Sequence, residues 1–231
     1  MFDGRWRSNI EKGLKPLGAK IRRTGLKADH ITALGVVFAV GAAVAIGAGA
    51  LRVGLLLLIL TGLPDLIDGA VAKAGGNPSQ RGAFLDSVAD RLTDALLFGG
   101  VAYYLAVNEP GPVAILPVAV MVSAFLVSYQ RAKADALGYD ARGGIMERAE
   151  RFILLGFGLL FDQLLIPVLW VMLALSVVTA VQRFVKVWRQ ASEPKPVKAQ
   201  PTRRRPRRAA QSTTQRWRTR ARDRQSGRRS P

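Results

Sequence analysis

Long apolar stretches alternate with short polar connections from about residue 31 to residue 186. A helix that spans a membrane needs about 20 predominantly apolar residues, and six stretches reach or approach that length. They cover residues 31–50, 52–74, 82–106, 111–134, 147–164 and 165–186. The pattern therefore predicts an all-α, polytopic membrane protein with six transmembrane helices.

The two ends of the chain have a different pattern. In residues 1–26, apolar side chains recur at helical spacing among Arg and Lys, which is typical of an amphipathic helix in the membrane interface. Residues 191–231 are rich in Pro, Arg, Gln, Ser and Thr, with too few apolar residues to bury a core. We therefore expect a juxtamembrane helix at 1–26, a six-helix membrane domain at 27–190 and a disordered basic tail at 191–231.

The formal net charge is +18, and most of the excess lies near the C-terminus. Residues 189–231 contain fifteen Lys and Arg against two acidic residues. Basic residues also collect in alternate connections, which by the positive-inside rule predicts that both termini are cytoplasmic, in the plasma membrane of the cell. Beside such a membrane face we expect the tail to meet anionic lipid or solvent, and nucleic acid is not an expected partner.

Four aspartates interrupt the apolar pattern: Asp65, Asp68, Asp86 and Asp90. An ionised Asp near the centre of a bilayer costs about 2.5–3.5 kcal/mol, so a bound cation is expected there. Positions three and four apart share a helix face, so each pair forms a two-carboxylate edge. On neighbouring helices these edges would form one four-carboxylate site on the cytoplasmic side. A plainer interpretation is that the aspartates are solvated at helix ends.

The chemistry of such a site favours a hard divalent cation. The chain has no Cys, so oxygen ligands remain, and these suit Mg²⁺, Mn²⁺ or Ca²⁺. Mg²⁺ is the first choice because it commonly bridges a few carboxylates and substrate phosphates, with Mn²⁺ as an alternative. Gly69 and Gly82 flank the two edges, where a missing side chain would let a nucleotide or a neighbouring backbone approach.

This segment resembles a known signature. Asp65-Leu-Ile-Asp68-Gly69-Ala-Val-Ala-Lys73, followed after eight residues by Gly82-Ala-Phe-Leu-Asp86-Ser-Val-Ala-Asp90, is similar to the D-x2-D-G-x2-A-R-x8-G-x3-D-x3-D motif of the CDP-alcohol phosphotransferases. Lys73 stands where the family has Arg, so the positive charge is kept and the bidentate hydrogen bonding of a planar guanidinium is lost. The resemblance implies six membrane helices, a homodimer, and transfer of a substituted phosphate group from a CDP-linked donor to an alcohol with release of CMP.

The resemblance also implies roles for individual residues. Asp65, Asp68, Asp86 and Asp90 would be metal ligands, and Asp90 would also act as the catalytic general base on the acceptor hydroxyl. Residues near the nucleotide would be Gly69, Lys73, Gly82 and Thr32. Thr32 lies in a stretch similar to the family's P-D-x-x-T-x-x-G segment, although helix capping by Asp29 explains that stretch about as well.

Four basic residues at predicted cytoplasmic helix ends are candidates for binding an anionic acceptor: Arg131, Lys133, Arg151 and Arg183. They come from three separate helices, and arginine binds phosphate through charge-assisted pairs. A plainer interpretation is that they contact lipid headgroups. Their segments resemble those of the actinobacterial phosphatidylinositol phosphate synthases, which implies CDP-diacylglycerol as donor and inositol phosphate as acceptor.

Three alternatives to this function stay open. The same chemistry could use glycerol phosphate or another polar alcohol as acceptor. A non-catalytic membrane anchor could present the basic tail to nucleic acid or acidic proteins. Ion transport is disfavoured because the carboxylates cluster toward one side instead of marking a path across the bilayer.

Overall fold

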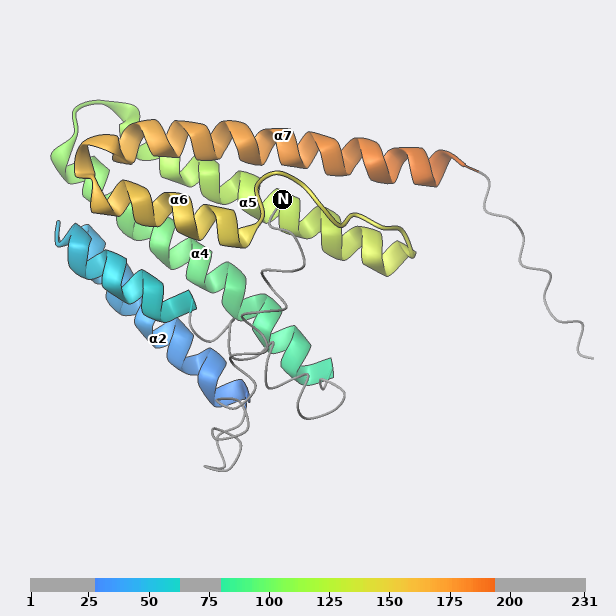
Figure 1. The fold of residues 1–231 in the computed structure, drawn as a ribbon, viewed down its shortest axis with the longest axis horizontal. Helices are drawn as coiled ribbons and strands as arrows, with labels where there is room; N and C mark the ends of the chain where they lie inside the picture. Colours follow the sequence, from blue (N-terminus) through green and yellow to red (C-terminus); the bar gives the residue numbers. More distant parts are fainter. Residues whose placement is uncertain (1–27, 63–79, 194–231) are drawn as a thin grey trace, which may run out of the picture. The chain divides into compact units, whose positions relative to one another are not determined.

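The structure is a computed structural model that describes residues 28–62 and 80–193. Every regular element within these ranges is helical, which confirms the predicted all-α class for them. The longer helices are α2 (Ala28–Gly47), a helix at Leu51–Gly62, α4 (Gln80–Asn108), α5 (Ile115–Leu137), α6 (Arg148–Leu160) and α7 (Leu165–Ser192) (Figure 1). Two 3₁₀ turns, η1 (Pro112–Ala114) and η2 (Asp162–Leu164), precede α5 and α7.

Several predicted features lie outside the described residues. They are the juxtamembrane helix at 1–26, the first acidic edge with its neighbours (Asp65, Asp68, Gly69 and Lys73), and the tail from residue 194 onward.

Within residues 28–62 and 80–193, three segments are long and apolar enough to cross a membrane: Asp29–Gly47, Pro112–Leu137 and Asp162–Ser192. Helix α4 has 29 residues, but its first half carries Arg81, Asp86, Asp90, Arg91 and Asp94. Helix α6 has 13 residues, and the helix at Leu51–Gly62 is also too short for a full span where it is described. The structure therefore supports a membrane-integral protein, and the crossing of the membrane by six helices stays a prediction.

The apolar core lies between the helices. Helix α2 packs against α4, α4 against α5, and both α5 and α6 against α7, which runs beside α5 in Figure 1. One contact is especially close: a side chain at Gly100 of α4 would place its Cβ 2.6 Å from the carbonyl oxygen of Ala43 in α2. Glycine is therefore required at this crossing, because the neighbouring backbone cannot yield as a side chain can.

The outer surface of the helices is also apolar. Val37 and Val44 of α2, Val122 of α5 and Trp170 of α7 are each more than half exposed. A water-soluble protein rarely exposes apolar surface on this scale, whereas a lipid-facing helix bundle does so on every side. This surface agrees with the membrane assignment from length and hydropathy.

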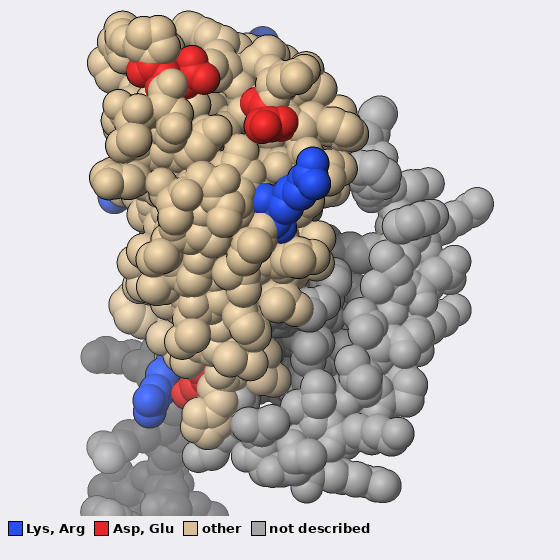
Figure 2. All heavy atoms as spheres, turned by 90° about the vertical axis from the view of Figure 1, so that its left-hand side faces the viewer, with Lys and Arg blue, Asp and Glu red and all other residues tan. Residues whose placement is uncertain are grey.

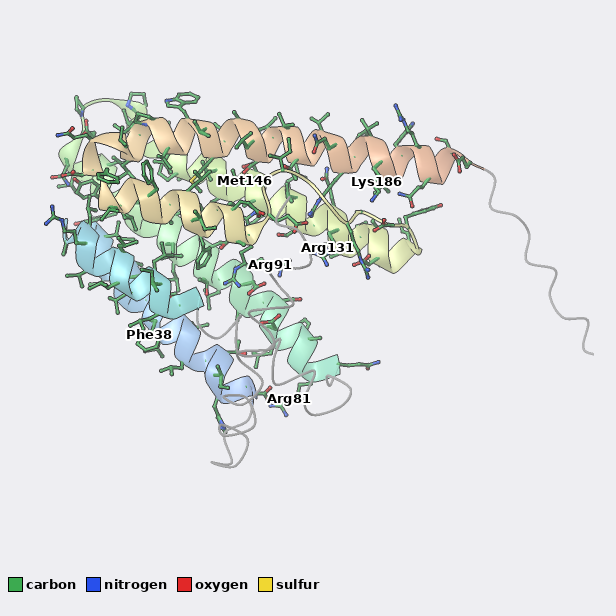
Figure 3. The ribbon with its side chains drawn as sticks, in the orientation of Figure 1. Phe38, Arg81, Arg91, Arg131, Met146 and Lys186 are labelled. Carbon is green, nitrogen blue, oxygen red and sulfur yellow. The ribbon has the colours of Figure 1, made fainter. Side chains whose placement is uncertain are left out.

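The two ends of the described helices differ in charge. The connections at 47–51, 108–115 and 160–165 gather at one end, on the left of Figure 1. Figure 2 looks onto that end and shows a mostly uncharged surface with a few isolated acidic and basic side chains. Arg81, Arg131 and Lys186 lie in the other half (Figure 3). This asymmetry has the form that the positive-inside rule predicts.

Candidate active site

Helix α4 carries a row of acidic side chains on one face. Asp86, Asp90 and Asp94 are spaced by four residues, so they lie on the same side of the helix. Their burial increases along the row: Asp86 is exposed, the Asp90 side chain is 25% exposed and that of Asp94 is 6% exposed. Asp94 is not among the residues predicted from the sequence, yet it is the most buried carboxylate of the three.

Two arginines of α6 form ion pairs with Asp90 and Asp94, two of the three carboxylates in this row. Nη1 of Arg148 lies 2.6 Å from Oδ1 of Asp90, and Nη2 of Arg151 donates a 2.9 Å hydrogen bond to Oδ2 of Asp94. Nε of Arg148 also lies 3.9 Å from Oδ1 of Asp94. These four residues form an ion-pair ladder between α4 and α6, in the order Asp90, Arg148, Asp94, Arg151.

The start of α6 presents both arginines to α4. Glu147 is the N-cap and forms a capping box with Glu150, whose carboxylate accepts a hydrogen bond from the Glu147 backbone N–H. Arg148 and Arg151 follow three residues apart and therefore share one face of the helix. The guanidinium of Arg148 also lies over the ring of Phe152, 4.8 Å from its centroid, which restricts its orientation.

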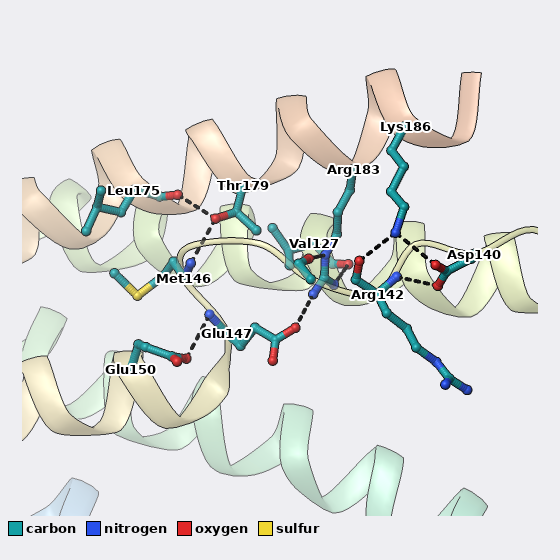
Figure 4. Close-up of polar contacts among 11 residues, drawn as sticks. Val127, Asp140, Arg142, Met146, Glu147, Glu150, Leu175, Thr179, Arg183 and Lys186 are labelled. Atoms are coloured by element: carbon teal, nitrogen blue, oxygen red, sulfur yellow. Dashed lines mark hydrogen bonds and ion pairs between the residues drawn. The ribbon is translucent and has the colours of Figure 1, made fainter. Parts of the chain in front are cut away.

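Arg183 of α7 holds the connection between α5 and α6. Its side chain is 4% exposed. It donates hydrogen bonds to the carbonyl oxygens of Gly143 and Val127 and to Oε1 of Glu147, at 2.9, 3.0 and 2.9 Å (Figure 4). Three of its five N–H donors are thus engaged, and the other two make no hydrogen bond to the part of the chain that the structure describes.

Further contacts from α7 hold the same connection. The hydroxyl of Thr179 accepts a hydrogen bond from the backbone N–H of Met146, and Nζ of Lys186 donates to Oδ2 of Asp140 and to the carbonyl oxygen of Arg142 (Figure 4). The hydrogen bond from Lys186, followed by that from the Arg142 backbone N–H, holds the pKa of Asp140 below its ordinary value. The connection is therefore tied to α7 over much of its length.

The four predicted acceptor-binding residues divide into two kinds. Arg131 and Lys133 are exposed on α5, whereas Arg151 and Arg183 are buried and bonded to protein groups. The charges of Arg131 and Arg151 lie within electrostatic range of Arg183, so the fold brings arginines from α5, α6 and α7 together. Nε of Arg151 is buried and finds no hydrogen-bond partner among the residues that the structure describes.

The predicted metal and nucleotide residues are described only in part. Asp86 and Asp90 lie one turn apart on α4, with Gly82 one turn before them and half-buried, and Thr32 is half-buried in α2. The residues at 28–62 and 80–193 contain no group of three or more acidic, His or Cys side chains that could hold a metal ion. Asp86, which is exposed, and Asp90, which is 25% exposed and ion-paired with Arg148, nevertheless supply the carboxylate oxygens that suit a hard divalent cation.

Sequence reasoning missed two members of the ladder. Asp94 continues the four-residue spacing of Asp86 and Asp90, and that regularity could have identified it. Arg148 is not among the residues predicted from the sequence, because no local signal shows that it reaches α4. Its partner becomes visible only when the helices are packed.

The chain is similar to several known proteins. Residues 26–188 match the family described as CDP-alcohol phosphatidyltransferase. An archaetidylinositol phosphate synthase of Methanothermobacter thermautotrophicus is 35% identical over 80% of this chain and 93% of its own. A phosphatidylinositol phosphate synthase of Streptomyces avermitilis is 33% identical over 81% of this chain and 82% of its own.

Solved structures of the phosphatidylinositol phosphate synthase of Mycobacterium tuberculosis are similar in fold. The structure with CDP-DAG bound has a TM-score of 0.72 and 30% identity, covering 80% of this chain and 98% of that one. The structure in complex with manganese and citrate has a TM-score of 0.71 and 31% identity, covering 76% and 88%. The match over residues 26–188 and these relatives show that the chain belongs to the CDP-alcohol phosphatidyltransferase family.

Proposed function

We propose that this membrane-integral protein transfers a phosphatidyl group from CDP-diacylglycerol to inositol phosphate and releases CMP. The observation that carries the proposal is the meeting of two features: the acidic face of α4 and the arginines of α5, α6 and α7. The first suits a metal-assisted phosphoryl transfer, and the second suits an anionic acceptor.

The relatives support the acceptor more firmly than the donor. The names of the archaeal and the Streptomyces relatives both contain inositol phosphate, and they differ in the lipid part, archaetidyl in one and phosphatidyl in the other. CDP-diacylglycerol is proposed because CDP-DAG is bound in a similar solved structure. Glycerol phosphate or another polar alcohol is the alternative acceptor.

Asp90 is proposed as the general base. Its carboxylate is partly exposed and could accept the proton of the acceptor hydroxyl. The hydroxyl oxygen then forms a bond to the phosphorus that carries diacylglycerol, the pyrophosphate P–O bond breaks, and CMP leaves with the bonding electron pair. Arg148 fixes the orientation of Asp90 through the contact between Nη1 and Oδ1.

Asp65, Asp68, Asp86 and Asp90 are proposed to hold the divalent cation, with Mg²⁺ preferred and Mn²⁺ as the alternative. When bound, such a cation would offset the negative charge of the diphosphate and of the departing CMP. The manganese complex of a similar structure supports dependence on a divalent metal. Gly69, Gly82, Lys73 and Thr32 are proposed to line the nucleotide site, where the glycines would permit close approach.

Arg131, Lys133, Arg151 and Arg183 are proposed to bind the acceptor phosphate. Among the described residues, the buried Nε–H of Arg151 has no partner, and Arg183 keeps two N–H groups beyond those bonded to Gly143, Val127 and Glu147. These are the donors proposed for the phosphate oxygens. Arg131 and Lys133 would add charge from the exposed side of α5. An arginine that is already held by protein contacts loses little side-chain entropy when it binds a ligand.

The placement of the protein in the cell belongs to the same proposal. We expect a homodimer in the plasma membrane, with both termini and the active site cytoplasmic. The asymmetric charge of the two helix ends supports this orientation. Residues 1–26 are proposed to lie along the interface and residues 191–231 to form a basic tail.

An acceptor panel tests the function. Purified protein would be given CDP-diacylglycerol with inositol phosphate, glycerol phosphate, inositol or no acceptor, with Mg²⁺ or with EDTA, and the CMP released would be counted. The proposal predicts Mg²⁺-dependent CMP release that inositol phosphate supports best. Faster release with glycerol phosphate would support the alternative acceptor, and release that none of the acceptors increases would refute the transferase.

A further inference from the structure

The buried carboxylate of Asp94 has no part in the proposed chemistry, yet it is bonded to a residue of the proposed acceptor pocket. Its side chain is 6% exposed and that of Arg151 is 4% exposed, with 2.9 Å between Oδ2 and Nη2. A buried ion pair adds little net stability, because the cost of desolvation offsets the attraction between the charges. Net stability therefore does not explain why this ion pair is buried.

Asp94 engages only one side of the Arg151 guanidinium. The hydrogen bond uses Nη2, while Nε has no partner among the described residues. Because the group is planar and rigid, fixing Nη2 also fixes the direction of the Nε–H bond. Asp94 thus holds Arg151 in one orientation, with the buried Nε–H unpaired among the described residues.

Asp94 also connects this arginine to the proposed general base. Its other oxygen, Oδ1, lies 3.9 Å from Nε of Arg148, whose Nη1 lies 2.6 Å from Asp90. Alternating charges therefore connect α4 and α6 beside the proposed general base.

We propose that Asp94 is a positioning residue, which orients Arg151 toward the acceptor phosphate. Through Arg148, it also holds this phosphate site at a fixed position relative to Asp90. This inference rests on the proposed function, because it takes Arg151 as an acceptor-binding residue. It predicts that a substitution of Asp94 changes the KM for the acceptor much more than the KM for the donor.

The first test is a comparison of steady-state constants for wild type and Asp94→Asn. With inositol phosphate varied, we expect its KM to rise at least about tenfold, because a partly released arginine binds phosphate less well. The KM for CDP-diacylglycerol should stay within about twofold. An equal change in both constants, or no change in either, would overturn the role of Asp94.

A double-mutant cycle makes the test specific. In an Arg151→Gln background, Asp94→Asn should cause no further rise in the acceptor KM, because its effect passes through that arginine. Independent, multiplying effects would contradict the proposal. Thr93→Val, which alters a buried neighbour on α4, is the matched control and should leave the ratio of the two KM values unchanged.

Asp94→Asn leaves Arg151 without its counter-charge and could prevent folding. Asp94→Glu keeps the charge and moves the carboxylate by one methylene, so the acceptor KM should still rise, by about threefold, in a folded protein. An unchanged acceptor KM in Asp94→Glu would overturn the proposal. Wild-type protein that releases no CMP would refute the proposed function itself. If the wild type is active and the Asp94 variants change the KM values for acceptor and donor equally or not at all, only the role of Asp94 is refuted.

Discussion

Nη1 of Arg148 lies 2.6 Å from Oδ1 of Asp90, so the proposed general base is held by an arginine from a different helix. A second arginine, Arg91, lies 3.6 Å from Oδ2 of the same carboxylate. A base held in this way keeps its orientation before substrate arrives, which is what catalysis by a positioned group requires. The ladder also explains how charged residues are tolerated inside an apolar bundle.

Replacing Asp90 should abolish most of the activity. Asp90→Asn keeps the size of the side chain and removes its ability to accept a proton, so kcat should fall at least about 100-fold. CMP release under saturating substrates would measure the effect. Asp135→Asn, which removes an exposed charge from α5, should retain wild-type kcat. Equal rates in Asp90→Asn and wild type would exclude Asp90 as the base.

Replacing Arg148 should slow the reaction less severely. Arg148→Gln leaves Asp90 in place without its orienting partner, so we expect kcat to fall by about tenfold. Arg142→Gln, which alters an exposed arginine of the α5–α6 connection, serves as the control. If both variants retain wild-type kcat, the contact between Arg148 and Asp90 has no part in turnover.

The crossing of α2 and α4 gives a prediction about stability. Gly100→Ala would bring Cβ to 2.6 Å from the Ala43 carbonyl oxygen, whereas Gly99→Ala meets no atom within 4 Å. We expect Gly100→Ala to destabilise the protein by about 1–3 kcal/mol through overpacking. Thermal unfolding in detergent should therefore show a lower Tm for Gly100→Ala and not for Gly99→Ala. The reverse order would contradict the described packing.

Arg183 should control the order of the α5–α6 connection. Arg183→Lys keeps the charge and cannot reproduce hydrogen bonds to Gly143, Val127 and Glu147 together. Hydrogen exchange in residues 138–147 should rise at least about tenfold, while exchange in α2 stays unchanged. Unaltered exchange in this connection would show that other contacts suffice to hold it.

The contact between Asp140 and Lys186 predicts a dependence on pH. The pKa of Asp140 is held below its ordinary value of 3.8, chiefly by the hydrogen bond from Lys186. The carboxylate therefore stabilises the folded state above that value, and this contribution is lost as the pH falls through the lowered pKa. Asp140→Asn should lower Tm slightly at pH 7, and the difference should shrink under strongly acidic conditions. A constant difference at all pH values would argue against the ion pair as its source.

The helices could be predicted from the sequence because apolar stretches of this length have few other stable forms in a membrane. The predicted span at 165–186 corresponds to α7. This helix continues to Ser192, through the more polar end that contains Lys186, Trp188 and Arg189. The span at 147–164 corresponds to the shorter α6, since η2 interrupts the chain at Asp162. Boundaries of this kind depend on local turns that hydropathy does not register.

The candidate site was predictable only where one helix decides the geometry. The shared face of Asp86 and Asp90 follows from their spacing alone. The pairing of Asp94 with Arg151 joins residues 57 positions apart, so it depends on how α4 and α6 pack. For the same reason, the sequence predicted an acceptor or lipid-headgroup contact for Arg183, and its hydrogen bonds to the α5–α6 connection became visible only in the structure.

The most direct test of the proposed function is to identify the lipid that the protein makes. Purified protein would be incubated with CDP-diacylglycerol, inositol phosphate and Mg²⁺, and the organic phase would be examined by mass spectrometry beside Asp90→Asn and EDTA controls. The account predicts phosphatidylinositol phosphate in amounts equal to the CMP released, and none in either control. Release of CMP with phosphatidic acid as the only lipid product, or the same product from Asp90→Asn, would contradict it.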